Sequence, residues 1–151
     1  MRAALTILLL ALAGCAATPQ AEYPRDTEAK RFTVDPYAAT IYVFRTDMRS
    51  DDEEEQDTVL HLDGRVIGGT LPGTYFRIDA NAGTRTLHGY GYDVGGLKLE
   101  VRHGEIYFVE LNVTNGHSHF RRVAPETAKA RIARCCVLLE NWATGQRPLL
   151  R

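Results

Sequence analysis

The residues best placed to do chemistry lie in the segment "TRTLHGYGY" (Thr84–Tyr92). Successive side chains of a strand point to opposite faces, so His88, Tyr90 and Tyr92 share one face and the intervening leucine and glycines share the other. Tyrosine offers a flat, amphipathic surface that suits a peptide or a sugar. We therefore take His88, Tyr90 and Tyr92 as a candidate ligand or partner face, with packing in the core or along its edge as the alternative.

A second pair of side chains, His117 and His119, flanks Ser118. On an extended segment the two imidazoles share a face and could chelate a metal, but a third ligand would have to come from elsewhere in the chain. Ser118 points away from both, so the triplet is not a nucleophile with its base. The spacing assembles no acid–base pair and no nucleophile, so we predict no metal, no cofactor, no catalytic residue and no enzyme.

The acidic run between Asp51 and Asp57 has the oxygen ligands that Ca²⁺ prefers. It lacks the alternating acidic positions and the central glycine of an EF-hand loop. Consecutive carboxylates repel one another and stay hydrated. We interpret the run as a solvated loop, with a weak contact to a cation or a basic partner as the alternative.

Two cysteines, Cys135 and Cys136, are adjacent in the chain. A disulfide normally needs Cα atoms roughly 4.4–6.8 Å apart, whereas sequential Cα atoms lie about 3.8 Å apart. The simplest expectation is one buried thiol and one partly exposed thiol. A vicinal redox pair and an intermolecular disulfide stay open as alternatives.

The N-terminus has the pattern of an export signal. Arg2 precedes an apolar segment from Ala3 to Ala13, about half the roughly 20 residues that a membrane-spanning helix needs. The following "LAGC" resembles the lipobox of bacterial lipoproteins, in which the cysteine receives a diacylglycerol and the bond before it is cut. That resemblance implies that residues 1–14 are a signal peptide, that Cys15 carries acyl chains such as palmitate, and that Cys15 anchors the protein in a membrane. Ala16, where inner-membrane lipoproteins often carry aspartate, favours the outer membrane.

Length and charge narrow the function classes further. Without residues 1–14, the 151-residue chain retains 137 residues, enough for one domain with a proper core. The 18 basic and 19 acidic residues give the whole chain a formal net charge of −1, which provides no electrostatic footprint for nucleic acid.

The mature chain divides into two parts. Residues 15–38 are polar and contain Pro19, Pro24 and Pro36, so we expect a flexible tether of up to about 65 Å. Residues 39–151 contain about eight short β-rich runs separated by turn residues, such as Asp63-Gly64. The spacing predicts an antiparallel β-sandwich, immunoglobulin-like or transthyretin-like. A single helix is expected in "APETAKARIARC", followed by a last strand or a tail.

Three segments, "ATIYVFR", "LDGRVIGGTLPGTYFRIDANAGTRTL" and "GEIYFVEL", resemble a family of bacterial lipoproteins defined by the domain of unknown function 2846 (DUF2846). The resemblance covers about residues 39–123. It implies a sandwich-like fold and defines no activity. Together with the lipobox it predicts a lipid-anchored protein of the cell envelope that faces the periplasm. We expect a non-catalytic module that binds another envelope protein, or alternatively a binder of a small ligand or cell-wall glycan.

Overall fold

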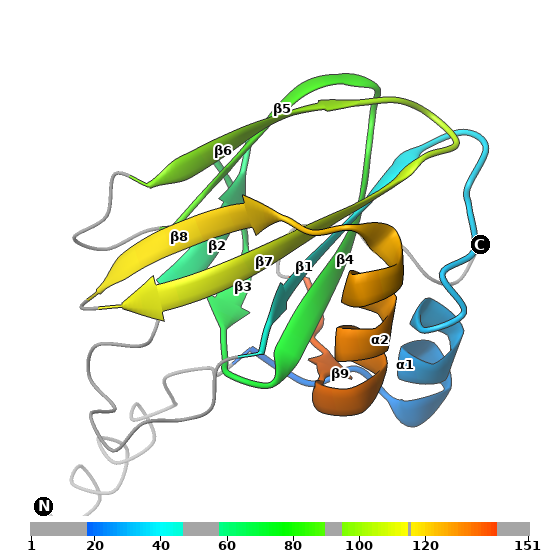
Figure 1. Cartoon of the computed structure of the whole chain (residues 1–151), viewed down its shortest axis with the longest axis horizontal. Coiled ribbons are helices and arrows are strands. Elements are labelled where there is room, and N and C mark those ends of the chain that lie inside the picture. Colours follow the sequence, from blue (N-terminus) through cyan, green and yellow to red (C-terminus); the bar gives the residue numbers. More distant parts are fainter. Residues whose placement is uncertain (1–17, 47–57, 90–94, 115, 142–151) are drawn as a thin grey trace, which may run out of the picture.

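The chain folds into two β-sheets packed face to face, with helices on one side (Figure 1). The computed structural model describes residues 18–46, 58–89, 95–114 and 116–141. The five-stranded sheet has the order β8 (His117–Arg122), β7 (Ile106–Thr114), β1 (Ala39–Arg45), β4 (Thr74–Ala80) and β9 (Val137–Leu138). The four-stranded sheet has the order β3 (Arg65–Thr70), β2 (Thr58–Leu62), β5 (Gly83–His88) and β6 (Gly96–Val101). The structure confirms the predicted β-sandwich class.

The two described helices, α1 (Tyr23–Ala29) and α2 (Pro125–Cys135), pack on the outer face of the five-stranded sheet (Figure 1). This arrangement explains why β1 is buried along its whole length. Ile41 and Val43 face the other sheet, whereas Tyr42 and Phe44 face the helices. A strand covered on both faces reads as a continuous apolar run, which is the pattern of "TIYVF".

The core therefore has two parts. The larger cluster fills the space between the sheets and includes Ile41, Leu60, Phe76 and Leu111. The smaller cluster lies between the five-stranded sheet and the helices and is built around the stacked rings of Tyr42 and Phe108, whose centroids are 5.3 Å apart.

Two turns have the geometry that their residues predict. Asp63 and Gly64, with φ angles of 50° and 77°, join β2 to β3 in the hairpin predicted from the Asp-Gly pair. Gly104, with φ of 75°, lies in the short connection between β6 and β7. The two strands that flank Gly104 belong to different sheets, so this turn carries the chain from one layer to the other.

The expectation of purely antiparallel sheets is wrong for two strand pairs. β1 runs parallel to β7, and β4 runs parallel to β9, whereas the other five pairs are antiparallel. Parallel neighbours require a long crossover, and hairpin turns in the sequence give no signal for it. The ninth strand, β9, follows the two cysteines, in the segment for which the sequence predicted either a last strand or a tail.

The tether predicted for residues 15–38 is wrong for its described part, residues 18–38. Helix α1 lies within it and packs against the sheet, where the Tyr42 hydroxyl donates a hydrogen bond to the carbonyl of Ala29 at 2.7 Å. The ring of Phe32, just after α1, contacts the rings of Tyr42 and Phe108. Further upstream, Gln20 forms a β-bridge with Leu139. The folded body therefore begins before Ala39.

Helix α2 confirms the predicted C-terminal helix. Pro125 occupies its first turn with Glu126 beside it, and Ala128 and Ile132, one turn apart, are buried against the sheet. Within the described ranges, neither helix is long and apolar enough to cross a bilayer.

Candidate functional site

The predicted residue His88 lies on the outer face of the four-stranded sheet, which we call the open sheet face. Its members are the outward side chains of β3, β2, β5 and β6, on the side away from α1 and α2 (Figure 1). Leu87 is fully buried on the inner side, whereas His88 is half-buried on the outer side. The alternation predicted for this part of the segment is confirmed.

His88 is stacked on His61 from the neighbouring strand. The two residues are register partners in the antiparallel pair β2–β5, and their rings lie 4.9 Å apart with an interplanar angle of 14°. His61 Nδ1 lies 3.0 Å from the Val59 carbonyl oxygen, which fixes the orientation of its ring. Sequence spacing did not reveal this pair, because the register of β2 against β5 brings together residues 27 positions apart.

The next residue, Gly89, lies just beyond the end of β5, where there is no room for a side chain. A Cβ atom placed on Gly89 would clash with the side chain of Ser118 and lie 2.7 Å from Thr58 Oγ1. Ser118 Oγ itself donates a hydrogen bond to Thr58 Oγ1 at 3.2 Å. Side chains of β2 and β8 thus approach Gly89, which directly follows the last residue of β5, closely from the inner side.

Apolar, polar and charged side chains surround the histidine pair on the open sheet face. Val66, the register partner of His61, is 39% exposed. Lys98 and Glu100 of β6 are exposed and alternate with the inward Leu99. The face therefore combines a stacked ring pair with an exposed valine and charges of both signs.

Several predicted features lie outside the described residues: Tyr90 and Tyr92 of the candidate face, the acylation site Cys15, and the acidic run 51–57. Of the candidate face, the structure therefore describes His88 alone.

The candidate metal pair, His117 and His119, lies on β8. Both side chains are exposed, and Ser118 between them is buried, as the alternation predicts. Their register partners on β7 are Thr114 and Asn112. Among the described residues, no group of three or more His, Cys, Asp or Glu side chains could hold a metal ion.

Sequence reasoning missed a charged cluster around Glu110 of β7. Glu110 accepts hydrogen bonds from Thr46 at 2.8 Å and from Arg131 of α2 at 2.7 Å, and it also binds Arg121 of β8. Burial alone would raise the pKa of Glu110, but the hydrogen bonds from Arg121 and Thr46 and the charge of Arg131 lower it below its ordinary value. The cluster joins β1, β7, β8 and α2, which is a structural role.

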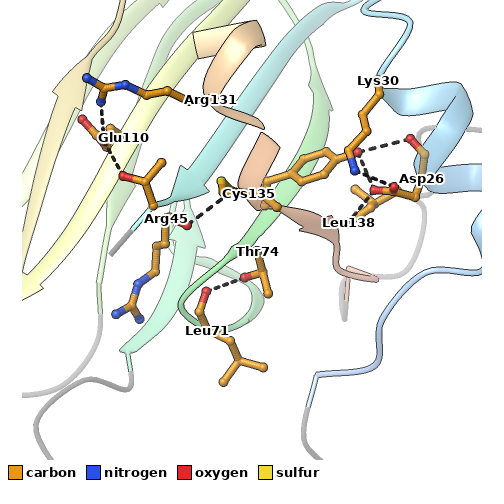
Figure 2. The surroundings of a disulfide bond; sticks show 12 residues. Asp26, Lys30, Arg45, Leu71, Thr74, Glu110, Arg131, Cys135 and Leu138 are labelled. Atoms are coloured by element: carbon orange, nitrogen blue, oxygen red, sulfur yellow. Dashed lines mark hydrogen bonds and ion pairs between the residues drawn. A yellow bond between two sulfur atoms is a disulfide. The ribbon is translucent and has the colours of Figure 1, made fainter. Parts of the chain in front are cut away.

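A second buried carboxylate, Asp26 of α1, holds the N-terminal segment to the sheet (Figure 2). Its Oδ1 accepts hydrogen bonds from the Leu138 amide at 2.9 Å and the Tyr75 hydroxyl at 3.0 Å, and its Oδ2 pairs with Lys30 at 2.7 Å. Burial and the nearby Asp26 carboxylate raise the pKa of Tyr75, so this phenol stays neutral and its hydroxyl donates a hydrogen bond to the carboxylate.

The structure also has a hollow of about 180 Å³ at one end of the sandwich. Most of its lining is apolar, and a single cationic side chain, Arg122, contributes to its wall. Its volume is below the several hundred Å³ typical of drug-sized ligand sites. The lining residues are Leu99, Ile106, Tyr107, Phe108, Arg122, Val123 and Pro125.

The expectation of free thiols at Cys135 and Cys136 is wrong, since a disulfide joins them (Figure 2). Their burial follows the expectation: Cys135, the last residue of α2, is exposed, and Cys136 is 4% exposed. Cys136 Sγ lies 3.4 Å from the Arg45 carbonyl oxygen. Adjacent Cα atoms 3.7 Å apart lie below the usual disulfide range, which is why the spacing argued against the bond.

Comparison with known proteins adds no relative. No protein-family model matches this chain, and no curated protein or solved structure is significantly similar to it. The resemblance to the DUF2846 lipoproteins stays a prediction that rests on the three segments quoted above.

Proposed function

We propose that this protein is an acylated lipoprotein of the bacterial envelope whose β-sandwich serves as a non-catalytic interaction module in the periplasm. The lipobox supports attachment through acyl chains on Cys15, and Ala16 supports the outer membrane. The partner on this proposal is another envelope protein, bound at the open sheet face.

The observation that carries the proposal is the difference between the two sheets. Helices α1 and α2 cover the outer face of the five-stranded sheet, whereas within the described ranges no helix covers the open sheet face. The cores of protein-binding surfaces are enriched in aromatic residues and depleted of charged ones, with a polar rim around them. On the open sheet face, His61, His88 and Val66 form the corresponding group, and Lys98 and Glu100 provide a charged surround.

In-cell photo-crosslinking tests this proposal directly. A photoreactive amino acid replaces Val66, His88 or Lys98 in the lipidated protein at native level, and adducts are identified by mass spectrometry. Lys129, an outward-facing residue of α2, is the matched control on the opposite side of the molecule. We expect one discrete protein adduct at the open sheet face that is absent at Lys129. The same adducts at all positions, or no protein adduct at any of them, would refute the proposal.

The alternative function is binding of a small ligand or a cell-wall glycan, and its candidate site is the hollow beside Tyr107, whose volume of about 180 Å³ holds only part of such a ligand. An apolar cavity with one cationic group fits a small molecule that carries both an apolar part and a negative charge. Titration of isotopically labelled protein with a cell-wall muropeptide tests it. Saturable shifts of the Tyr107 and Val123 amides would support the alternative, and shifts confined to His61 and His88 would place the ligand on the open sheet face.

A further inference from the structure

The vicinal disulfide between Cys135 and Cys136 lies at the junction of α2 and β9, outside the surface proposed for partner binding (Figure 2). Cys136 packs in the apolar cluster beneath the helices, together with Ile132 and Leu138. Cys135 faces solvent at the end of the helix. An approaching molecule therefore reaches the bond from the Cys135 side.

This disulfide closes the smallest possible loop. In the chain-entropy account, a cross-link stabilises a fold by restricting the unfolded chain, and the effect grows with the number of residues enclosed. Two adjacent residues enclose an eight-membered ring, so the bond restricts the unfolded chain very little. The fold is held at this point by other contacts: Val137 N donates to Gly73 O at 3.1 Å, and Leu138 N donates to Asp26 Oδ1 at 2.9 Å.

The surroundings also accommodate the reduced pair. The Arg45 carbonyl oxygen, 3.4 Å from Cys136 Sγ, is an acceptor for a thiol at that position. The Cys136 amide donates to Ile132 O at 3.1 Å, so the backbone on both sides of the bond is fixed independently of the sulfurs. Opening the disulfide therefore leaves the helix end and β9 in place.

From the exposure of one sulfur, the burial of the other and this independent backbone support, we propose that Cys135–Cys136 is a thiol–disulfide exchange site for a dithiol partner. A thiolate of the partner attacks Cys135 Sγ, forming a mixed disulfide, and Cys136 leaves as a thiolate that takes a proton from water. The second thiolate of the partner then attacks the partner's own sulfur in the mixed disulfide and releases Cys135. The partner dithiol is oxidised to a disulfide and the cysteine pair is reduced by two electrons.

Mass-based thiol counting tests the exchange in the purified mature protein, whose Cys15 is acylated and takes no label, under native conditions. Dithiothreitol is the dithiol probe, and maleimide labelling reports the free thiols. We expect no label before reduction, two labels after reduction, and an unchanged circular dichroism spectrum and melting temperature within a few degrees. Labelling of both cysteines before reduction, reduction that requires denaturant, or loss of the fold on reduction would each overturn the proposal.

Single variants test which sulfur is attacked. Glutathione disulfide is added to Cys136→Ser, which keeps the exposed thiol, and to Cys135→Ser, which keeps the buried one. We expect the mixed disulfide to form at least ten times faster in Cys136→Ser, and equal rates would overturn the assignment of Cys135. A far-ultraviolet spectrum confirms that each variant is folded. If one variant does not fold, peptide mapping of the wild-type protein trapped with iodoacetamide during reduction identifies the attacked cysteine.

Discussion

The side chain that a single position tolerates depends on the atoms packed around it, and these often come from distant parts of the sequence. Gly89 is an example, because its neighbours Ser118 and Thr58 come from strands that lie far from it in the sequence. The sequence pattern placed Gly89 on the same face as Leu87. It could not say which residues approach, since that depends on the packing of β8 over β2 and β5.

Replacement of Gly89 by alanine is expected to destabilise the fold by about 1–3 kcal/mol, because the new methyl group overlaps Ser118 and Thr58. Chemical denaturation measures the loss. The double variant Gly89→Ala/Ser118→Ala removes one of the overlapping atoms, so its loss should be smaller than the sum of the two single losses. Additive losses would show that the clash is relieved elsewhere.

Glu110 gives a prediction about pH. Its ordinary pKa of 4.5 applies to the unfolded chain, and the ion pairs in the folded state lower it, so the stabilisation is complete above about pH 4.5 and is lost as the pH falls through the folded-state pKa. Glu110→Gln should cost about 1–3 kcal/mol at pH 7. The difference from wild type should shrink as the pH is lowered from 4.5. Denaturant unfolding at several pH values measures it, and a constant difference would contradict the assignment.

At the scale of elements, the sequence predicted the hairpins and helices whose signals lie in neighbouring residues. The Asp63-Gly64 turn predicted a hairpin, and Pro125 with Glu126 in a first turn predicted a helix. Both elements are present. The parallel pair β1–β7 was missed because its register depends on a connection through the other sheet. The stacked pair His61–His88 was missed for the same reason, since it depends on the register of two strands.

Helix α1 was missed because it carries almost no apolar signal. The residues it buries are Asp26 and Ala29, and its N-cap, Glu22, makes no side-chain capping bond. A seven-residue helix is not stable by itself, so tertiary contacts must hold it. Several of these contacts are made by Asp26, whose carboxylate accepts hydrogen bonds from an amide, a hydroxyl and an ammonium group.

Asp26→Ala is therefore expected to release α1 and β9 while the sandwich persists. The amides of α1 and Leu138 should lose most of their hydrogen-exchange protection, whereas those of Ile41 and Val43 should keep theirs. Glu28→Ala is the matched control, because Glu28 is on the same helix but pairs with Arg31 in a more exposed position, and it should change little. If the amides of α1, β9 and β1 lost protection equally, α1 would not unfold separately from the sandwich.

At the scale of the whole molecule, the extent of the folded body determines how an anchored domain sits on a membrane. Thr18 is already buried and Gln20 pairs with Leu139. If Cys15 is the acylated residue, the three residues from Cys15 to Thr18 allow a reach of about 10 Å, far less than the roughly 65 Å expected of a tether that lasts to residue 38. A partner would then have to come close to the bilayer surface to meet the sandwich.

Two aromatic residues between 18 and 38 test whether the folded body begins before α1 or only at residue 39. Phe32 contacts Tyr42 and Phe108, whereas Tyr37, five positions later, is 83% exposed. If the body begins before α1, Phe32→Ala should lower the free energy of unfolding by about 2–3 kcal/mol through lost ring packing, and Tyr37→Ala should leave it within about 0.5 kcal/mol of wild type. Denaturant titration of the full-length protein measures both. If Phe32→Ala left the free energy of unfolding unchanged, the long tether would be the better description, and a domain anchored through Cys15 could then meet partners well away from the bilayer.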